Sequence, residues 1–174
     1  RTESGFASML PMSQGRTFIT WLDELETAGG TMSISAGIFS RTGNTISEWE
    51  LDRQVCDCCA TSAAMSSKGP VVVYRDRSDT EIRDISITRY VNDKWTQPTA
   101  VHNDGWEIAG CPVNGPSVSA KGDNVAVSWF TAKGNIPKVQ LVLSTDNGES
   151  FSPPVLVSSQ TTNGRVGTTF LENG

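Results

Sequence analysis

Three of the four cysteines in this 174-residue chain, Cys56, Cys58 and Cys59, fall within four consecutive positions. The fourth, Cys111, lies in the segment Gly-Cys-Pro-Val-Asn-Gly-Pro. Thiolates are soft ligands for copper(I) or zinc, whereas paired cysteines form the disulfides of exported proteins. Three alternatives follow: disulfide staples, a copper or zinc site with the single histidine, His102, as a further ligand, or free buried thiols.

A second cluster of chemical groups is the charged segment 75–84, which holds three arginines and four carboxylates in ten residues. Either it is a solvated hairpin that neutralises itself, or Arg75, Arg77 and Arg83 bind an anionic ligand. The second alternative follows from the guanidinium fork, which pairs with a carboxylate through two parallel hydrogen bonds.

An aromatic ring beside acidic groups marks a third candidate position. Trp106 lies between Asp104 and Glu107 in the sequence. A sugar subsite typically combines an apolar ring face with hydroxyl acceptors, and Trp106 offers such a face. A plug of the hydrophobic core is the equal alternative.

The elements that position these groups are short β-strands. No segment has a sustained helical period, and runs such as 71–74 and 125–129 are apolar enough for strands buried on both faces. A two-sheet sandwich is the competing arrangement. The strands that we expect are Ala7–Met12, Thr17–Asp23, Met32–Phe39, Ser47–Leu51, Cys59–Met65, Val71–Arg75, Ile82–Tyr90, Thr99–His102, Pro116–Ala120, Asn124–Phe130, Lys138–Ser144, Val155–Ser158 and Arg165–Phe170.

The turn Ser144-Thr-Asp146-Asn-Gly148-Glu-Ser-Phe151 lies between two of these strands. Asn and Gly accept positive φ, and Asp bonds the backbone of its own turn, so the segment predicts a hairpin. Its pattern resembles the Asp-box, the bacterial neuraminidase repeat of sialidase-like β-propellers. Fainter copies of the pattern occur near Trp49 and Trp95. The aromatic residues Trp49, Trp95 and Phe151 are 46 and 56 residues apart, which is close to the length of a propeller blade.

The resemblance implies an all-β propeller of four-stranded antiparallel blades, of which about three and a half are present, as part of a six-bladed ring. We expect blades at 1–51, 52–102 and 103–160, and the start of a further blade at 161–174, in a single incomplete domain. The remainder, a second chain or a missing segment, is an expected partner. Because the Asp-box turn lies at the end of the blade opposite the loop face, we expect a structural role for Ser144, Asp146, Gly148 and Phe151.

Propeller topology also predicts which segments meet. The links between blades and the turn between strands two and three lie at the same end, opposite the Asp-box turn. Three segments should therefore share one face: the links 51–59 and 102–115 and the turn 75–83. Neighbouring first strands lie side by side, so Cys111 should approach the group formed by Cys56, Cys58 and Cys59.

Sialidases use an arginine triad, an aspartate acid/base and a tyrosine nucleophile. Their first arginine lies in an Arg-Ile-Pro motif, and the nearest segment here, Phe6–Pro11, has no arginine, so no catalytic residue is carried over by motif. The chain is also similar, over Arg53–Phe151, to uncharacterised exported bacterial propellers labelled sialidase-like, which implies no established activity.

Three functions remain open. The first is a propeller that binds a glycan or another anionic ligand on its loop face. The second is a glycoside hydrolase of sialidase type, with Glu107, Asp104 or Asp76 as the proton donor. The third is a metal-binding propeller that uses the cysteines.

Composition indicates which partners and which cellular compartment to expect. The formal net charge is −5, which argues against a nucleic-acid or anionic-membrane partner. No apolar run is long enough to span a membrane. Few lysines and turns rich in Gly and Ser favour an exported protein, periplasmic or extracellular.

Overall fold

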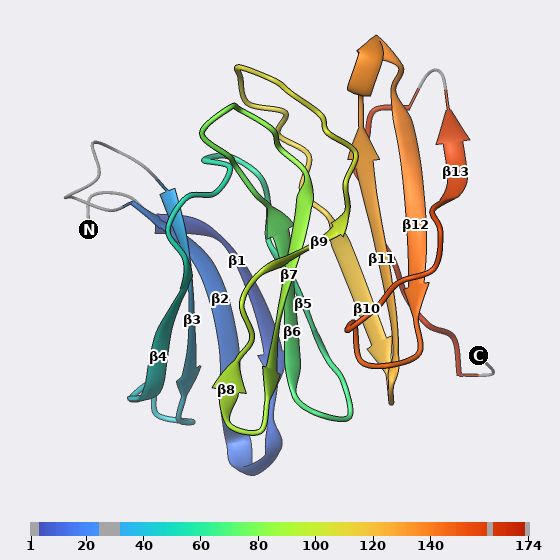
Figure 1. Ribbon diagram of the computed structural model, residues 1–174. Coiled ribbons are helices and arrows are strands. Elements are labelled where there is room, and N and C mark those ends of the chain that lie inside the picture. The colour runs from blue at the N-terminus through green and yellow to red at the C-terminus, as the bar shows by residue number, and fades with distance from the viewer. Residues whose placement is uncertain (1–3, 25–31, 160–161, 173–174) are drawn as a thin grey trace.

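The chain forms three antiparallel sheets that follow one another in sequence (Figure 1). The computed structural model describes residues 4–24, 32–159 and 162–172. The first sheet contains β1 (Ser4–Pro11), β2 (Thr17–Glu24), β3 (Met32–Phe39) and β4 (Thr45–Asp52). The second contains β5 (Ser62–Met65), β6 (Pro70–Arg75), β7 (Ile85–Val91), β8 (Lys94–Trp95) and β9 (Thr99–His102). The third contains β10 (Ser117–Lys121), β11 (Asn124–Thr131), β12 (Lys138–Ser144) and β13 (Val155–Ser159).

The expected all-β class is confirmed. The only helical segments in the described ranges are two 3₁₀ turns, η1 (Ser13–Gly15) and η3 (Lys133–Asn135). Strands β3, β9 and β12 have the expected bounds, and the other predicted strands that form differ by one to three residues at an end. The sequence did not predict β8, which extends the hairpin from β7 through a turn in which Asn92 and Asp93 have positive φ.

The second sheet is packed on both faces, and this explains the uniformly apolar sequence of β6. All six residues of β6 are buried. Val71 and Val73 join a core shared with the third sheet, and Val72 and Tyr74 join a core shared with the first. Because its side chains alternate between the two cores, β6 links them into one structure. Burial of each such side chain contributes about 1.5–3 kcal/mol.

The first strands of successive sheets lie side by side, as expected, with β5 between β1 and β10. Serine side chains join them. The Ala63 amide donates to Ser8 Oγ at 3.1 Å, and the Val118 amide donates to Ser62 Oγ at 3.1 Å. These bonds align each sheet with the next at its first strand.

Segment 165–170, expected to be a strand, is irregular. It lies beside β10 and repeats the serine contact, because the Thr168 amide donates to Ser117 Oγ at 2.9 Å and the Phe170 amide to Ser119 Oγ at 3.1 Å. A strand is defined by a hydrogen-bonded ladder with a neighbour, and among the described residues this segment has none.

The turn Ser144–Phe151 closes the β12–β13 hairpin through contacts of its own side chains. Asp146 accepts hydrogen bonds from the Ser144 hydroxyl (2.6 Å) and from the Glu149 and Ser150 amides (both 3.0 Å). Gly148 has φ of 80° and donates to Ser144 Oγ at 2.8 Å. Hydrogen bonds from Ser144 and Ser150 hold the pKa of Asp146 well below its usual range.

Candidate functional site

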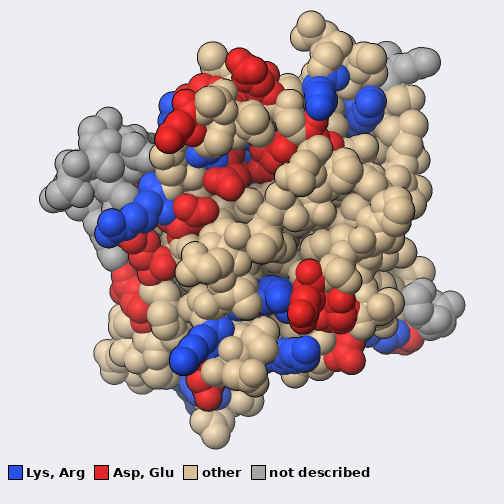
Figure 2. Space-filling model, viewed as in Figure 1, with Lys and Arg blue, Asp and Glu red and all other residues tan. Residues whose placement is uncertain are grey.

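Three segments from different parts of the chain meet at one end of the molecule. The link after β4 pairs with the loop after β6 through the Val55–Asp76 bridge, and that loop pairs with the link after β9 through the Ile82–Glu107 bridge. Charged side chains of both signs lie at the end that carries these loops, at the top of Figure 2, and also at the opposite end, whereas the middle of the surface over the third sheet is mostly uncharged. The convergence predicted from propeller topology is therefore observed.

Arg75 holds these segments together from the inside. It is 1% exposed, and its guanidinium donates to three backbone carbonyls: Asn114 (2.9 Å), Arg83 (2.6 Å) and Phe130 (2.7 Å). It also lies 5.0 Å from the centre of the Trp106 ring. Burial lowers the pKa of Arg75 to about 10, which still leaves the group protonated at neutral pH. The structure thus places Arg75 in the interior, with its three nitrogens bonded.

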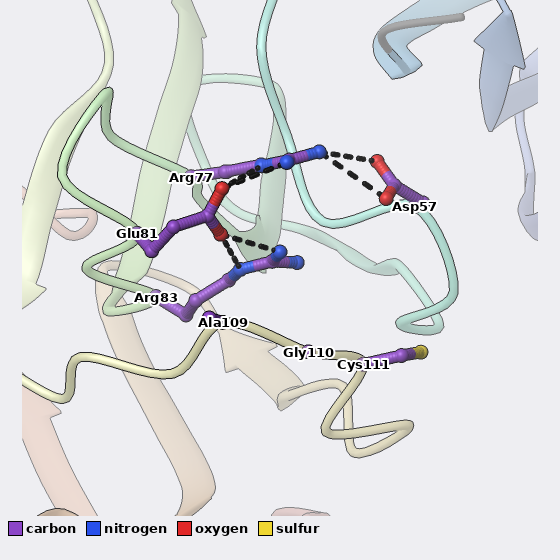
Figure 3. Close-up of a pocket in the computed structure, with 7 residues that line it drawn as sticks. All are labelled: Asp57, Arg77, Glu81, Arg83, Ala109, Gly110 and Cys111. Carbon is purple, nitrogen blue, oxygen red and sulfur yellow. Dashed lines mark hydrogen bonds and ion pairs between the residues drawn. The ribbon is translucent and has the colours of Figure 1, made fainter.

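The loop after β6 forms a chain of alternating charges (Figure 3). Arg77 donates to Glu81 Oε1 from Nε (3.1 Å) and Nη2 (2.7 Å), and its Nη1 reaches both oxygens of Asp57 at 3.3 Å. Arg83 donates to Glu81 Oε2 from Nε (3.2 Å) and Nη2 (2.7 Å). These bonds lower the pKa of Glu81, with Arg77 contributing first and Arg83 second, so Glu81 is ionised.

One donor of this cluster is unused. Arg83 is 3% exposed, and its Nη1 is buried without a hydrogen-bond partner among the described residues. In Figure 3 this nitrogen points away from Glu81, on the side of Asp57 and Cys111. Leaving a buried donor unsatisfied costs about 1–3 kcal/mol. The charges of the two arginines and the two carboxylates cancel. What the cluster lacks is a hydrogen-bond acceptor for Arg83 Nη1.

Arg83 is one of the residues that line a pocket of about 410 Å³. Its walls are Asp57, Arg77, Glu81 and Arg83 on the charged side and Ala109, Gly110 and Cys111 on the other. A ligand that enters here meets two guanidinium groups and two carboxylates. Such a lining favours a small anion that also carries hydroxyl groups, because carboxylates accept hydrogen bonds from hydroxyls while guanidinium groups bind the charge.

The cysteines tie the two walls together. Cys58 is paired with Cys111, with 6.3 Å between their Cα atoms, and Cys56 is paired with Cys59. Cys111 therefore lies beside the cluster of three cysteines, as expected. The sulfur atoms of Cys56, Cys58 and Cys59 lie within 4.8 Å of one another, a group that does not include His102.

Gly115 shows how closely the two links are packed. A Cβ atom built on Gly115 would lie 1.9 Å from the carbonyl oxygen of Ala60, and real Cβ atoms essentially never come that near. Only glycine lets the two backbones approach in this way. The contact sets the position of the link that carries Gly110 and Cys111.

Trp106 lies inside the molecule rather than on the loop surface. It is 7% exposed, and its ring packs edge-on against Phe130 with ring centres 5.7 Å apart. Trp106 also lines a hollow of about 250 Å³ beside the 3₁₀ turn η3.

The three candidate proton donors have different hydrogen-bond partners and surroundings. Asp104 is 8% exposed and accepts hydrogen bonds from Trp129 Nε1 (2.5 Å) and Gln140 Nε2 (2.9 Å). Glu107 lies in a separate hollow of about 250 Å³ beside the 3₁₀ turn η3.

Asp76 is the third candidate proton donor. It accepts bonds from the Arg77 amide (2.7 Å) and the Ser86 hydroxyl (3.0 Å). Burial, followed by the charge of Asp52, raises the pKa of Asp76.

The side chain of His102 is 38% exposed and lies 3.8 Å from Asp104 Oδ1.

The sequence did not single out Asp57, Glu81 or Gly110 as pocket residues. Asp57 stands between cysteines and Glu81 within the charged loop, so both were near the candidates. A signal for Glu81 existed in its spacing of four and two residues from Arg77 and Arg83. Nothing in the sequence marked the backbone of Ala109 and Gly110 as a wall.

Comparison with known proteins identifies the fold. No protein-family model and no curated protein sequence matches the chain. Among solved structures, the chain is similar to a polysaccharide lyase of family PL25, an ulvan lyase, bound to -[GlcA(1-4)Rha3S]-, with a TM-score of 0.59 and 11% identity over 88% of this chain and 42% of that one. A second PL25 ulvan lyase structure gives a TM-score of 0.60 and 11% identity over 92% and 45%.

The protein therefore shares an all-β fold with carbohydrate-active enzymes, and it spans less than half of the length of these relatives. These neighbours give no support to sialidase specificity. Within the described residues, the structure contains no helix long and apolar enough to cross a membrane.

Proposed function

We propose that this protein binds an acidic glycan in the pocket formed by Asp57, Arg77, Glu81, Arg83 and the backbone of 109–111. The observation that carries the proposal is the buried Arg83 Nη1 without an acceptor. The carboxylate of a uronic acid would supply that acceptor and a negative charge together. Its hydroxyl groups would donate to Asp57 and Glu81.

The structural neighbours support the same ligand class. One of them was solved with a polymer of glucuronate and sulfated rhamnose. At 11% identity this likeness concerns the fold, so the choice of ligand rests on the pocket of this chain. The proposal concerns binding, and it assigns no catalytic step to Asp76, Asp104 or Glu107.

We further propose that the three sheets are consecutive blades of a β-propeller and that Arg165–Phe170 begins the next blade. The repeated serine contacts support this arrangement, since Ser117 bonds Thr168 as Ser62 bonds Val118. Exposed Leu143 and Val157 on the third sheet would then face the next blade. Sedimentation of the 174-residue chain tests this: association that Leu143→Asp abolishes supports an open sheet face, and a monomer with no such dependence opposes it.

Export of the protein is a proposal that the two disulfides support, because such bonds persist in oxidising compartments. Copper or zinc binding is a second candidate function, favoured by the three grouped sulfur atoms, and it applies to the reduced protein. Reduction followed by stoichiometric uptake of copper(I) or zinc would support it, and no uptake by four free thiols would end it.

The test of glycan binding is calorimetric titration with D-glucuronate. Replacement of Arg83 by Gln should weaken binding by at least about tenfold, because it removes the charge and the fork. Arg53→Gln is the matched control, since the Arg53 side chain is 80% exposed and pairs with Glu50 outside the pocket. Equal affinity in the wild type and Arg83→Gln, with both proteins folded, would refute the proposal.

A further inference from the structure

A second hollow, of about 390 Å³, is lined by the next residues of the link that forms the pocket wall. Ala109, Gly110 and Cys111 line the first pocket, and residues 113–116 of the same link line the second hollow, together with Phe6, Ala60, Arg165 and Val166. One short segment of chain therefore separates the two. A ligand longer than one sugar residue that crosses this segment would reach both.

Two apolar side chains are held on the surface of this hollow. Phe6 is 46% exposed and Val113 is 53% exposed. Both have positive φ, 53° and 59°, which is unfavourable for a residue with a side chain and most of all for a β-branched one. Such conformations persist only where surrounding contacts impose them, and they concentrate at ligand sites.

The imposing contacts are present. The Phe6 carbonyl accepts a hydrogen bond from Thr61 Oγ1 at 2.7 Å, beside an irregularity in the β1–β2 register between Gly5 and Ser8. The carbonyl of Asn114, directly after Val113, accepts from Arg75 Nε at 2.9 Å. The interior of the protein thus fixes the backbone of both residues while their side chains face solvent.

The hollow also contains a free cation. The guanidinium of Arg165 is exposed and forms no hydrogen bond or ion pair with any residue that the structure describes. An aromatic ring, an aliphatic side chain and an unpaired guanidinium lie around one space. A pyranose ring offers an apolar C–H face, and a carboxylate or sulfate ester on it offers the matching charge.

We propose that this hollow, with Phe6, Val113 and Arg165, is a second subsite that binds the neighbouring acidic sugar of the same glycan chain. The inference rests on the proposed function, since the first pocket binds one uronate residue. It adds that the ligand is a polymer, and that affinity increases with chain length until both hollows are filled.

The test compares D-glucuronate with a hexasaccharide of the GlcA(1-4)Rha3S repeat, with maltohexaose as the neutral control. Phe6→Ala and Arg165→Gln should each weaken hexasaccharide binding by roughly tenfold and leave glucuronate binding unchanged. Met9→Ala is the matched control for Phe6, because Met9 is 66% exposed on the same strand and does not line the hollow. Arg53→Gln is the control for Arg165, and melting temperatures verify that each variant is folded.

The outcomes separate the two proposals. Equal affinity for glucuronate and the hexasaccharide, both dependent on Arg83, overturns the second subsite and leaves the first pocket standing. Hexasaccharide binding that depends on Arg83 but not on Phe6 or Arg165 does the same. Loss of any dependence on Arg83 overturns the proposed function itself.

Discussion

The Cys58–Cys111 disulfide should contribute more stability than Cys56–Cys59, because it closes a much longer loop. The paired residues are 53 positions apart in the first case and 3 in the second. In the chain-entropy model, the entropy lost by the unfolded chain grows with the logarithm of loop length. The model gives about 4 kcal/mol for Cys58–Cys111 and about 2 kcal/mol for Cys56–Cys59.

Two double variants isolate the bonds. Cys56→Ala/Cys59→Ala retains only the long-loop disulfide, and Cys58→Ala/Cys111→Ala retains only the short one. Each variant is unfolded in urea in its oxidised and reduced forms, and the difference in free energy of unfolding is the contribution of its remaining bond. Because both forms share one sequence, the packing change at the buried positions of Cys56 and Cys59 cancels.

The long-loop variant should lose about 4 kcal/mol on reduction and the short-loop variant about 2 kcal/mol. The same reduction should weaken glucuronate binding in the long-loop variant, because Cys111 is a pocket wall joined to the link that carries Asp57. Equal losses, or a larger loss in the short-loop variant, would refute the entropic reasoning. A stability loss without a change in affinity would show that the bond does not position the pocket.

Three further predictions concern groups around the site and at the opposite turn. Gly115→Ala should lower the free energy of unfolding in urea by about 3 kcal/mol. Gly110→Ala is the control, because no atom lies nearer than 3.9 Å to the added Cβ, and it should change that free energy by less than about 1 kcal/mol. Similar losses in the two variants would contradict the close approach of Gly115 to Ala60. Arg75→Lys should cost about 3 kcal/mol, because one ammonium cannot reach three separate carbonyls, and a loss under about 1 kcal/mol would show that these bonds are dispensable. Because the pKa of Asp146 is lowered in the folded protein, its ionised carboxylate stabilises the fold above the ordinary carboxyl pKa of about 4, and this contribution is lost as pH falls below that value. Asp146→Asn should therefore make the melting temperature depend less on pH between about pH 2 and 4. An unchanged slope of melting temperature against pH would contradict this role of Asp146.

Much of the fold was predictable because its signals are local. The uniformly apolar run of β6 and the turn at Ser144–Phe151 depend on neighbours in sequence, and both were found. Segment 165–170 has strand-like composition, but a strand requires a partner that the described chain does not supply. Pairing is a non-local property that composition does not contain.

The site was predictable only to the level of its face. Topology placed the charged loop beside both links, and the sequence could not say which arginine is internal. Side-chain alternation does not separate Arg75 from its neighbours, because β6 is buried on both faces. The roles differ through contacts across the fold, where Arg75 bonds carbonyls of distant segments and Arg83 keeps a free donor.

A crystal structure of the protein with D-glucuronate tests the central claim most directly. The account predicts the sugar carboxylate within hydrogen-bond distance of Arg83 Nη1, on the side of Asp57 and Cys111. A sugar bound elsewhere, with Arg83 Nη1 bonded to an ordered water, would contradict it.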